Sequence, residues 1–344
     1  MKEILKQLAR GTIAVAGGLS AMLVAQSATA AEINIYSHRQ QFLLQPFLDA
    51  FTAETGVETN VVYASKGLAQ RLQAEGEASP ADVILTVDIA RLSEYADLDL
   101  LAAVESPVLS ANIPANLRAG DNRWFAFSTR ARLVAVSKDR VPEGAISNIE
   151  DLADPKWQGT ICSRKGSHVY NRSLLASVVA ANGADAAEAW AEGLVANFAR
   201  KPQGNDRAQA KAIFEGQCDV AIMNHYYYGK MLFGDKDEQR DWANAIRLVF
   251  TNQDGRGNHV NISGGGVAKH SPHRDDAVRF LEFLTSPTAQ QLYGEVNFEY
   301  PTNPAVSPGG VLSSWGTFKS DDLAIERLAE LAPQAQMIID RSGW

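Results

Sequence analysis

The sequence predicts an α/β protein built from two lobes. Strand-like and helix-like segments alternate through its N-terminal third, and this order is typical of parallel strands joined by crossing helices. The chain has 344 residues. About 314 of them follow a leader-like segment, which is more than one hydrophobic core usually supports. The extended segment 124–136 is long enough to run from one lobe into the other.

The first 30 residues have the pattern of a secretory signal peptide. Three basic residues lie within the first ten positions, residues 11–25 are small and apolar, and residues 28–30 read Ala-Thr-Ala, a small-x-small cleavage pattern. The mature chain is therefore expected to begin at Ala31. No later segment is long and apolar enough to cross a bilayer, so an exported, soluble product is expected.

The charge balance argues against nucleic acid as a partner. Loss of the leader, with its three basic residues and one acidic residue, takes the formal charge from −8 to about −10. No basic patch interleaved with aromatic residues accompanies this acidity. A monomer that binds no nucleic acid is expected.

The first lobe is expected to contain three strand–helix units. The strands are predicted at 32–37, 57–63 and 81–86, and the helices at 42–56, 68–75 and 89–98. Parallel sheets bind ligands beyond the carboxyl ends of their strands. Residues 37–41 and 86–88 are therefore expected on the binding rim.

The second lobe repeats the pattern. A strand at 159–163 precedes a loop at 167–171, and an apolar strand at 220–223 runs into a turn and a short helix. Further helices are predicted at 173–181, 184–194, 206–215, 271–284 and 321–339. The run Gly264-Gly265-Gly266 fits neither nucleotide-binding glycine motif and indicates close backbone packing instead.

Tyrosines follow two strands of this second lobe. Tyr226 and Tyr227 come directly after one strand, and Tyr170 lies in the loop after another. A highly charged cation favours the phenolate form of tyrosine, so three phenols on one rim are candidate ligands for a hard metal. The alternatives are an aromatic corner packed into the core, an exposed stacking platform, and a Tyr170 that packs beneath the rim.

Three arginines are candidates for binding an anion. Arg39 is on the first lobe's rim, and its guanidinium fork suits carbonate or carboxylate; the alternative is a surface arginine paired with a carboxylate. Arg130 and Arg132 lie in the long extended segment, where strand alternation points both to one face. Arg130 is preferred as the residue that faces the cleft.

Cys162 and Cys218 are the only cysteines. In an oxidising compartment they are most simply one disulfide, which would tie together the two strands that precede the tyrosines; two buried thiols are the alternative. No nucleophile-and-base signature marks an enzyme. The side chain of His225 is expected to point away from the tyrosines, and His259 is expected in a surface loop.

Eight segments together resemble the periplasmic ferric-iron-binding proteins of ABC transporters, which are transferrin-like members of the type II solute-binding fold. The segments are IYSHRQ, SPADVILTVD, WFAFSTRAR, VYNRSL, ARKPQGNDR, NHYYYGKM, NISGGGVAKHSP and EYPTNP. The resemblance covers essentially the whole mature chain. It implies two α/β lobes, a central ligand cleft and crossover hinge strands. The lobes are expected at 31–130 plus about 252–300, and at 131–251 plus about 301–344.

The resemblance also implies a ligand set. Tyr226 and Tyr227 match the tyrosine pair that binds Fe³⁺ in the family, and Tyr170 matches a third tyrosine of one subgroup. Relatives with a first-lobe ligand carry it where this chain has Gln40, Gln41 or Val87. The chain is thus similar to the subgroup whose protein ligands all come from the second lobe. In that subgroup a synergistic anion, typically carbonate, completes the shell and is held by the arginine that matches Arg39; Tyr228 is expected to be structural.

The expected function is non-enzymatic capture of Fe³⁺ in the periplasm and its delivery to an inner-membrane ABC permease. A receptor for a small organic or phosphate-type anion without metal is the alternative within the binding class. An exported hydrolase or transferase is the alternative from another class. Metal content separates the first two, and an activity that survives metal removal would indicate the third.

Overall fold

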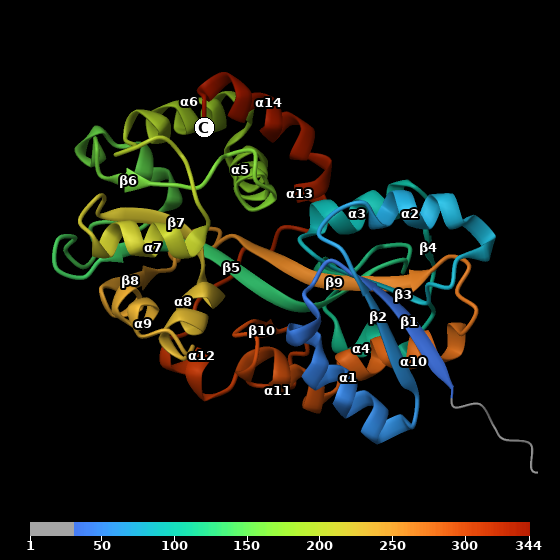
Figure 1. Cartoon of the computed structure of the whole chain (residues 1–344). Coiled ribbons are helices and arrows are strands. Elements are labelled where there is room, and N and C mark those ends of the chain that lie inside the picture. The colour runs from blue at the N-terminus through green and yellow to red at the C-terminus, as the bar shows by residue number, and fades with distance from the viewer. Residues whose placement is uncertain (1–30) are drawn as a thin grey trace, which may run out of the picture. The chain divides into compact units, whose positions relative to one another are not determined.

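The computed structural model describes residues 31–344 of the chain (Figure 1). The predicted signal peptide lies outside the described residues. Residues 31–344 form one compact unit that alternates strands and helices. Within these residues, none of the helices combines the length and the apolarity that crossing a lipid bilayer requires.

The strands form a mixed sheet with the order β2-β1-β3-β9-β5-β7-β6. β1 pairs in parallel with β2 and β3, as the alternating pattern predicts, whereas β9 is antiparallel to both β3 and β5. The strands are β1 (Glu32–Ser37), β2 (Glu58–Tyr63), β3 (Val83–Val87), β4 (Leu101–Ala102), β5 (Phe125–Ser137), β6 (Ile161–Cys162), β7 (Val220–Asn224), β8 (Ile246–Val249), β9 (Val260–Ala268) and β10 (Tyr300–Pro301).

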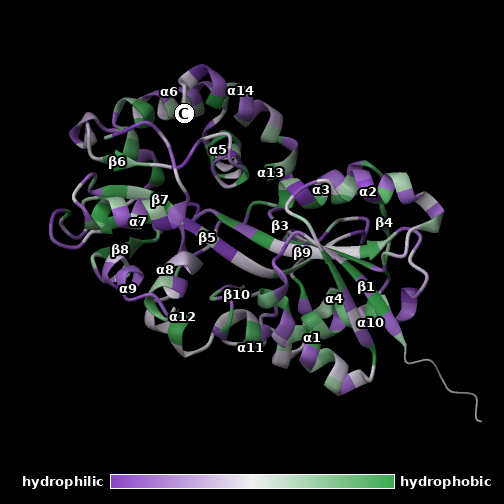
Figure 2. Cartoon of the chain, viewed as in Figure 1, coloured by the Kyte–Doolittle hydropathy of each residue, from purple (hydrophilic) through white to green (hydrophobic). Residues whose placement is uncertain are grey.

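The long strand β5 joins two groups of strands. Its first half, up to Ala131, pairs with β9, and its second half, from Arg132, pairs with β7 and β8. Figure 1 shows β5 and β9 running beside each other between the two groups, and Figure 2 shows a hydrophilic band within β5. The change of partners between Ala131 and Arg132 falls one residue from the boundary expected at 130/131. The other expected lobe boundaries stay predictions.

The glycine run lies in β9, where it allows three backbones to approach closely. A Cβ atom on Gly265 would lie 2.2 Å from the carbonyl oxygen of Ile84 in β3. On Gly264 it would lie 2.5 Å from the carbonyl oxygen of Phe125 in β5. The predicted packing role of the run is confirmed, since only glycine leaves room for both neighbouring strands.

The helices largely match the predicted segments. They are α1 (Gln41–Thr55), α2 (Leu68–Glu75), α3 (Ile89–Asp97), α4 (Pro107–Asn112), α5 (Val169–Asn182), α6 (Ala184–Ala196), α7 (Asp206–Phe214), α8 (His225–Leu232), α9 (Asp237–Asn244), α10 (Arg274–Leu284), α11 (Pro287–Glu295), α12 (Gly310–Ser314), α13 (Glu326–Glu330) and α14 (Ala332–Ser342). The prediction of a single helix at 321–339 is wrong, because the structure has two helices there, α13 and α14. Pro333 lies in the first turn of α14, where its missing N–H is tolerated, and a separate helix therefore begins there.

Aromatic contacts hold the helices in two groups. Phe51 of α1 packs edge-on against Phe280 of α10, with ring centroids 5.0 Å apart. Trp190 of α6 packs in the same manner against the C-terminal Trp344, at 5.8 Å. Figure 1 shows α14 beside α5 and α6, and these helices are in contact. The C-terminal helix thus covers the helices that follow β6.

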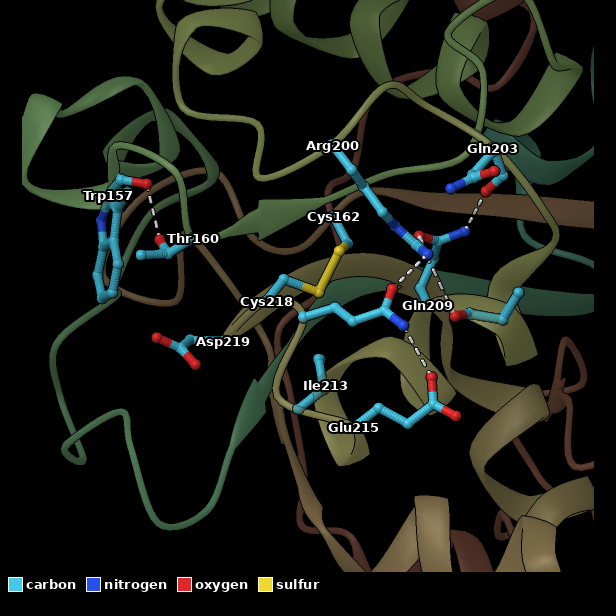
Figure 3. The surroundings of a disulfide bond; sticks show 12 residues. Trp157, Thr160, Cys162, Arg200, Gln203, Gln209, Ile213, Glu215, Cys218 and Asp219 are labelled. Carbon is cyan, nitrogen blue, oxygen red and sulfur yellow. Dashed lines mark hydrogen bonds between the residues drawn. A yellow bond between two sulfur atoms is a disulfide. The ribbon is translucent and has the colours of Figure 1, made fainter.

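A disulfide links Cys162 and Cys218, as predicted (Figure 3). Cys162 ends β6, and Cys218 lies two residues before β7 begins. β6 and β7 are parallel neighbours in the sheet. The bond therefore ties together the two strands whose following helices carry the candidate tyrosines.

Candidate metal and anion site

Tyr226 and Tyr227 lie in the first turn of α8, directly after β7. The turn predicted between strand and helix is absent, because helical geometry begins at once after Asn224. The backbone N–H of Asn224 donates to the carboxylate of Asp206 at 2.9 Å, which fixes the junction. Both phenols therefore extend from a helix N-terminus, whose partial positive charge favours negative oxygen atoms.

Tyr170 lies in the first turn of α5 and not in a loop. The loop predicted at 167–171 is therefore wrong at 169–171, where the helix has already begun. His168 caps this helix, because its Nδ1 accepts the backbone N–H of Tyr170 at 3.2 Å. The hydroxyl group of Tyr226 donates to that of Tyr170 at 3.2 Å. The ring centroids of Tyr226 and Tyr227 are 4.4 Å apart. The three tyrosines thus form one cluster, contributed by two helix starts.

Arginine side chains surround this cluster. Three guanidinium carbons lie over the Tyr170 ring, those of Arg130 at 5.5 Å, Arg132 at 5.9 Å and Arg164 at 5.2 Å. A fourth, that of Arg207, lies 5.1 Å from the centre of the Tyr227 ring. Arg130 and Arg132 face the same ring, as strand alternation predicts. Positive charge therefore lies beside the phenols, where it stabilises their ionised form.

Burial favours the neutral form of Tyr226 and Tyr227, because it raises the pKa of both phenols. Burial raises the pKa of Tyr226 well above its usual value, and the neighbouring Tyr170 and Tyr227 raise it further, while Arg130 acts in the opposite direction. Burial and Tyr170 likewise raise the pKa of Tyr227. A highly charged cation among the three oxygens would reverse this preference, so metal binding and proton release are coupled at this site.

Asp206 holds the surroundings of the cluster in place. The side chain is fully buried, and its two oxygen atoms accept from Arg132 at 3.1 Å and from Arg164 at 3.0 Å, in addition to the N–H of Asn224. Burial acts to raise the pKa of Asp206, but the guanidinium groups of Arg132 and Arg164 outweigh it and lower the pKa below its usual value. One carboxylate thus positions two cations and the start of α8.

Arg39 is buried rather than on the surface. Its Nη2 donates to Glu299 at 2.5 Å and to Ser263 at 2.6 Å. Its Nη1 is buried and has no hydrogen-bond partner among the described residues. Burial acts to raise the pKa of Glu299, but Arg39 and Arg130 outweigh it and lower the pKa. Arg39 therefore has a carboxylate partner, as one sequence interpretation expected, and one free N–H group.

Arg130 is buried and contacts both the Tyr170 ring and the strand β9. Its Nη2 donates to the carbonyl oxygen of Ile262 at 2.5 Å, and its Nε has no partner in the described part of the chain. Burial acts to lower the pKa of Arg130, but Tyr170, Tyr226 and nearby carboxylates outweigh it and raise the pKa. This guanidinium group remains charged whatever the state of the site.

The absence of a first-lobe ligand at Gln40, Gln41 and Val87 stays a prediction. Gln40 and Gln41 are exposed, and Gln41 donates to Gln45 at 3.3 Å. Among residues 31–344, no group of three or more His, Cys, Asp and Glu side chains is placed to hold a metal ion. The tyrosine cluster is therefore the candidate donor set that these residues offer.

Tyr228, His225 and His259 pack against other side chains or lie buried near the cluster. Tyr228 packs edge-on against Trp315, with centroids 5.3 Å apart. His225 stacks on Tyr300 at 4.8 Å, and its Nδ1 accepts the N–H of Ala131 at 3.1 Å. The prediction that His259 lies on the surface is wrong, because this residue is buried directly before β9, and burial lowers its pKa to about 3.

Sequence reasoning missed several residues that hold the site together. Asp206, Arg207 and Glu299 received no role, although each lies within a motif quoted for the resemblance. An acidic residue in a motif that also holds two arginines was the available signal for Asp206 and Arg207. Nothing local pointed to Glu299, since its partner Arg39 is 260 positions away in the sequence.

Comparison with known families assigns the chain. Residues 36–291, most of its length, match the model of the bacterial extracellular solute-binding proteins. The chain belongs to this family. A member from Synechocystis, iron uptake protein A1, is 42% identical to it over 91% of this chain and 87% of that protein.

Solved structures of family members agree with the fold. Ferric iron-binding protein A of Mannheimia haemolytica in an open conformation has a TM-score of 0.86 and 45% identity, over 91% of this chain and 99% of that one. The Trichodesmium protein IdiA (FutA), solved in complex with iron and citrate ligands, has a TM-score of 0.88 and 42% identity, over 91% of this chain and 100% of that one. This solute-binding protein therefore has the type II periplasmic binding protein fold, as the sequence predicted.

Proposed function

We propose that the protein captures Fe³⁺ in the periplasm and delivers it to an inner-membrane ABC permease, without catalysing a reaction. The similar proteins named above are described by iron uptake and ferric iron binding. The observation that carries the proposal is the meeting of three tyrosines at two helix starts, with a Tyr226–Tyr170 hydroxyl distance of 3.2 Å. Tyr170, Tyr226 and Tyr227 are the proposed ligands.

Charge supports this ligand set. Three phenolates balance the charge of Fe³⁺. The positive charge of the surrounding arginines favours ionisation of the tyrosine hydroxyl groups as iron binds. A synergistic anion such as carbonate then completes the shell. Arg39 supplies its unpartnered Nη1 to this anion, and Arg130 supplies its unpartnered Nε. Closure of the two lobes about the β5 and β9 hinge strands would exclude water, as in other binding proteins of this kind.

The tyrosine cluster is tested by the visible phenolate-to-iron charge-transfer band of the iron-loaded protein. The double variant Tyr226→Phe, Tyr227→Phe should lose the band and bind Fe³⁺ more weakly by over roughly 100-fold, since two of three ligands are removed. Tyr228→Phe is the matched control, because it deletes a neighbouring phenol oxygen outside the cluster, and it should keep the band. A band that persists in the double variant would refute the proposed ligands.

The anion role of Arg39 is tested separately. Arg39→Ala should weaken ferric binding and abolish its dependence on added carbonate, because the anion loses a charge-assisted donor. The exposed Arg279 of α10 provides the control Arg279→Ala, which should bind as the unchanged protein does. Iron affinity is measured by competition with a chelator at several carbonate concentrations. If affinity is independent of carbonate in both the unchanged protein and Arg39→Ala, the assigned role is wrong.

A further inference from the structure

A hydrogen bond joins α5 to the residue that caps α3. The hydroxyl group of Ser173, near the start of α5, donates to Oδ1 of Asp88 at 3.0 Å. Asp88 directly follows β3 and caps α3, because the same oxygen atom accepts the backbone N–H of Ala90 at 3.1 Å. One partner therefore belongs to the first predicted lobe and the other to the second.

Both partners of this bond are shielded from water. Asp88 and Ser173 are almost fully buried, and α13, which Figure 1 shows near α3 and α5, contacts both helices. A buried carboxylate depends on its hydrogen-bond donors, because its charged form has lost its hydration. The Oδ2 atom of Asp88 has no partner within residues 31–344. In this part of the chain, Ser173 is thus the one side chain that donates to the carboxylate.

The backbone of Asp88 is held in an unfavourable conformation. Its φ angle is +84°, in a region that residues other than glycine seldom adopt. Two hydrogen bonds to β9 fix this conformation. The N–H of Asp88 donates to the carbonyl oxygen of Ile262 at 2.8 Å, and the N–H of Ile89 donates to Oδ1 of Asn261 at 2.9 Å. The carboxylate is therefore presented to α5 from a fixed position.

We propose that the Ser173–Asp88 bond is a latch that holds the two predicted lobes together. Opening of the cleft would separate α5 from α3 and admit water to the carboxylate. Water would then satisfy both carboxylate oxygen atoms, including the Oδ2 atom that has no partner among the described residues. This hydration offsets part of the bond with Ser173, so the latch can open and close repeatedly.

The latch lies one helical turn from a proposed iron ligand. Ser173 and Tyr170 are three positions apart in α5 and therefore lie on the same side of the helix. Arg130 lies over the Tyr170 ring at 5.5 Å, and the carboxylate of Asp88 helps to raise the pKa of Arg130. Release of Ser173 would carry Tyr170 away from the first lobe, so the latch favours retention of iron. This link rests on the proposed function, whereas the latch itself requires no metal.

Small-angle X-ray scattering of the iron-free protein tests the latch. Ser173→Ala removes the donor and should increase the radius of gyration, because more molecules then have an open cleft. Ser177→Ala is the matched control, since Ser177 is also buried in α5 but donates to the carbonyl oxygen of Leu174 in the same helix, at 2.7 Å. The control should have the radius of the unchanged protein. Equal radii for Ser173→Ala and Ser177→Ala would overturn the proposal.

A second variant removes the other partner. Asp88→Gly deletes the carboxylate, while glycine accepts the positive φ and weakens a helix cap only slightly. It should increase the radius of gyration as Ser173→Ala does. The double variant should add nothing further, because both changes break the same bond. A double variant whose increase equals the sum of the two single increases would overturn the pairing.

Loss of iron to a chelator tests the role in retention. Iron-loaded Ser173→Ala should lose the metal roughly tenfold faster than Ser177→Ala, as expected for one hydrogen bond to a charged group. Its phenolate-to-iron band should keep its position, because the three phenols are unchanged. Equal rates of iron loss would overturn the role in retention.

The latch and the ferric site fail differently. A larger radius for iron-free Ser173→Ala, without an iron band in the unchanged protein, overturns the proposed ferric site and retains the latch. An iron band together with equal radii overturns only the latch.

Discussion

Replacement of Asp206 by asparagine is expected to weaken both the fold and the tyrosine site. The carboxylate is fully buried and accepts from three donors, namely Arg132 at 3.1 Å, Arg164 at 3.0 Å and the N–H of Asn224 at 2.9 Å. An amide is neutral and turns one NH₂ group toward a donor. The change therefore leaves two guanidinium groups near the tyrosines without their counter-charge.

The magnitude follows from the cost of breaking a buried ion pair. Removing one partner of such a pair typically costs about 3–5 kcal/mol, because the remaining charge is left unpaired away from water. The asparagine oxygen can retain the two contacts made by Oδ2, with Arg132 and the N–H of Asn224, whereas its NH₂ group then faces Arg164. The free energy of unfolding of Asp206→Asn should therefore fall by about 3 kcal/mol, at the lower end of this range. Iron affinity should fall as well, since Arg164, which lies over the Tyr170 ring, loses its acceptor and its counter-charge.

The dependence on pH gives this prediction a distinctive signature. The pKa of Asp206 is lower in the folded protein than its usual value, despite the opposing effect of burial, because of Arg132 and Arg164. Its stabilising contribution is therefore complete above the unfolded-state pKa of about 4 and is lost as the pH falls through the folded-state pKa. The stability difference between the unchanged protein and Asp206→Asn should be full at pH 7 and shrink below about pH 4.

Urea unfolding of the iron-free protein, followed by circular dichroism, measures this difference at several pH values. Asp139→Asn is the matched control, because Asp139 is exposed and the same chemical change there should have little effect. A loss at pH 7 below about 1 kcal/mol, indistinguishable from that of Asp139→Asn, would refute the central role assigned to Asp206.

Two further outcomes test the scaffold. Replacing Cys162 and Cys218 together by serine should lower the free energy of unfolding by up to about 4 kcal/mol, since the bond closes a loop with a sequence separation of 56. If the variant and the unchanged protein give the same unfolding curve without reductant, this expectation is wrong. Gly265→Ala should destabilise the sheet by at least about 1–3 kcal/mol, because its Cβ would lie 2.2 Å from a carbonyl oxygen of β3. Gly120→Ala is the control in thermal unfolding, because a Cβ atom on Gly120 would have no other atom within 4 Å. Equal melting temperatures for the two variants would show that the close approach at Gly265 does not require glycine.

Much of the fold was predictable because it depends on local patterns. The alternating residues of β1 and the helical spacing of α1 up to Gly56 place both elements, and Gly56 has the left-handed backbone of a helix end. The boundaries were less predictable where a capping side chain decides them. His168 begins α5 earlier than the apolar spacing indicates, and this moves Tyr170 from a loop into a helix.

The sequence predicted which residue types form the candidate site but not how their side chains are arranged. Tyrosines after two strands, and a cysteine pair able to link those strands, follow from residue types and their order along the chain. The geometry of the phenols required the parallel pairing of β6 with β7, which brings the following helices together. The ligand roles of Tyr170, Tyr226 and Tyr227, and the anion roles of Arg39 and Arg130, stay predictions.

The sequence by itself determined the α/β class and the tyrosines that follow two strands, because these depend on periodicity and on side-chain chemistry at short range. The sequence left the cysteine pair open between a disulfide and two thiols, and the structure places the two sulfur atoms in a bond. Only the tertiary structure decided which charges meet. Arg39 meets Glu299 across 260 positions, and Asp206 joins Arg132 and Arg164 from separate elements. The physical reason is that strand register and helix packing set the distances between distant side chains, and electrostatic energies depend on those distances and on burial.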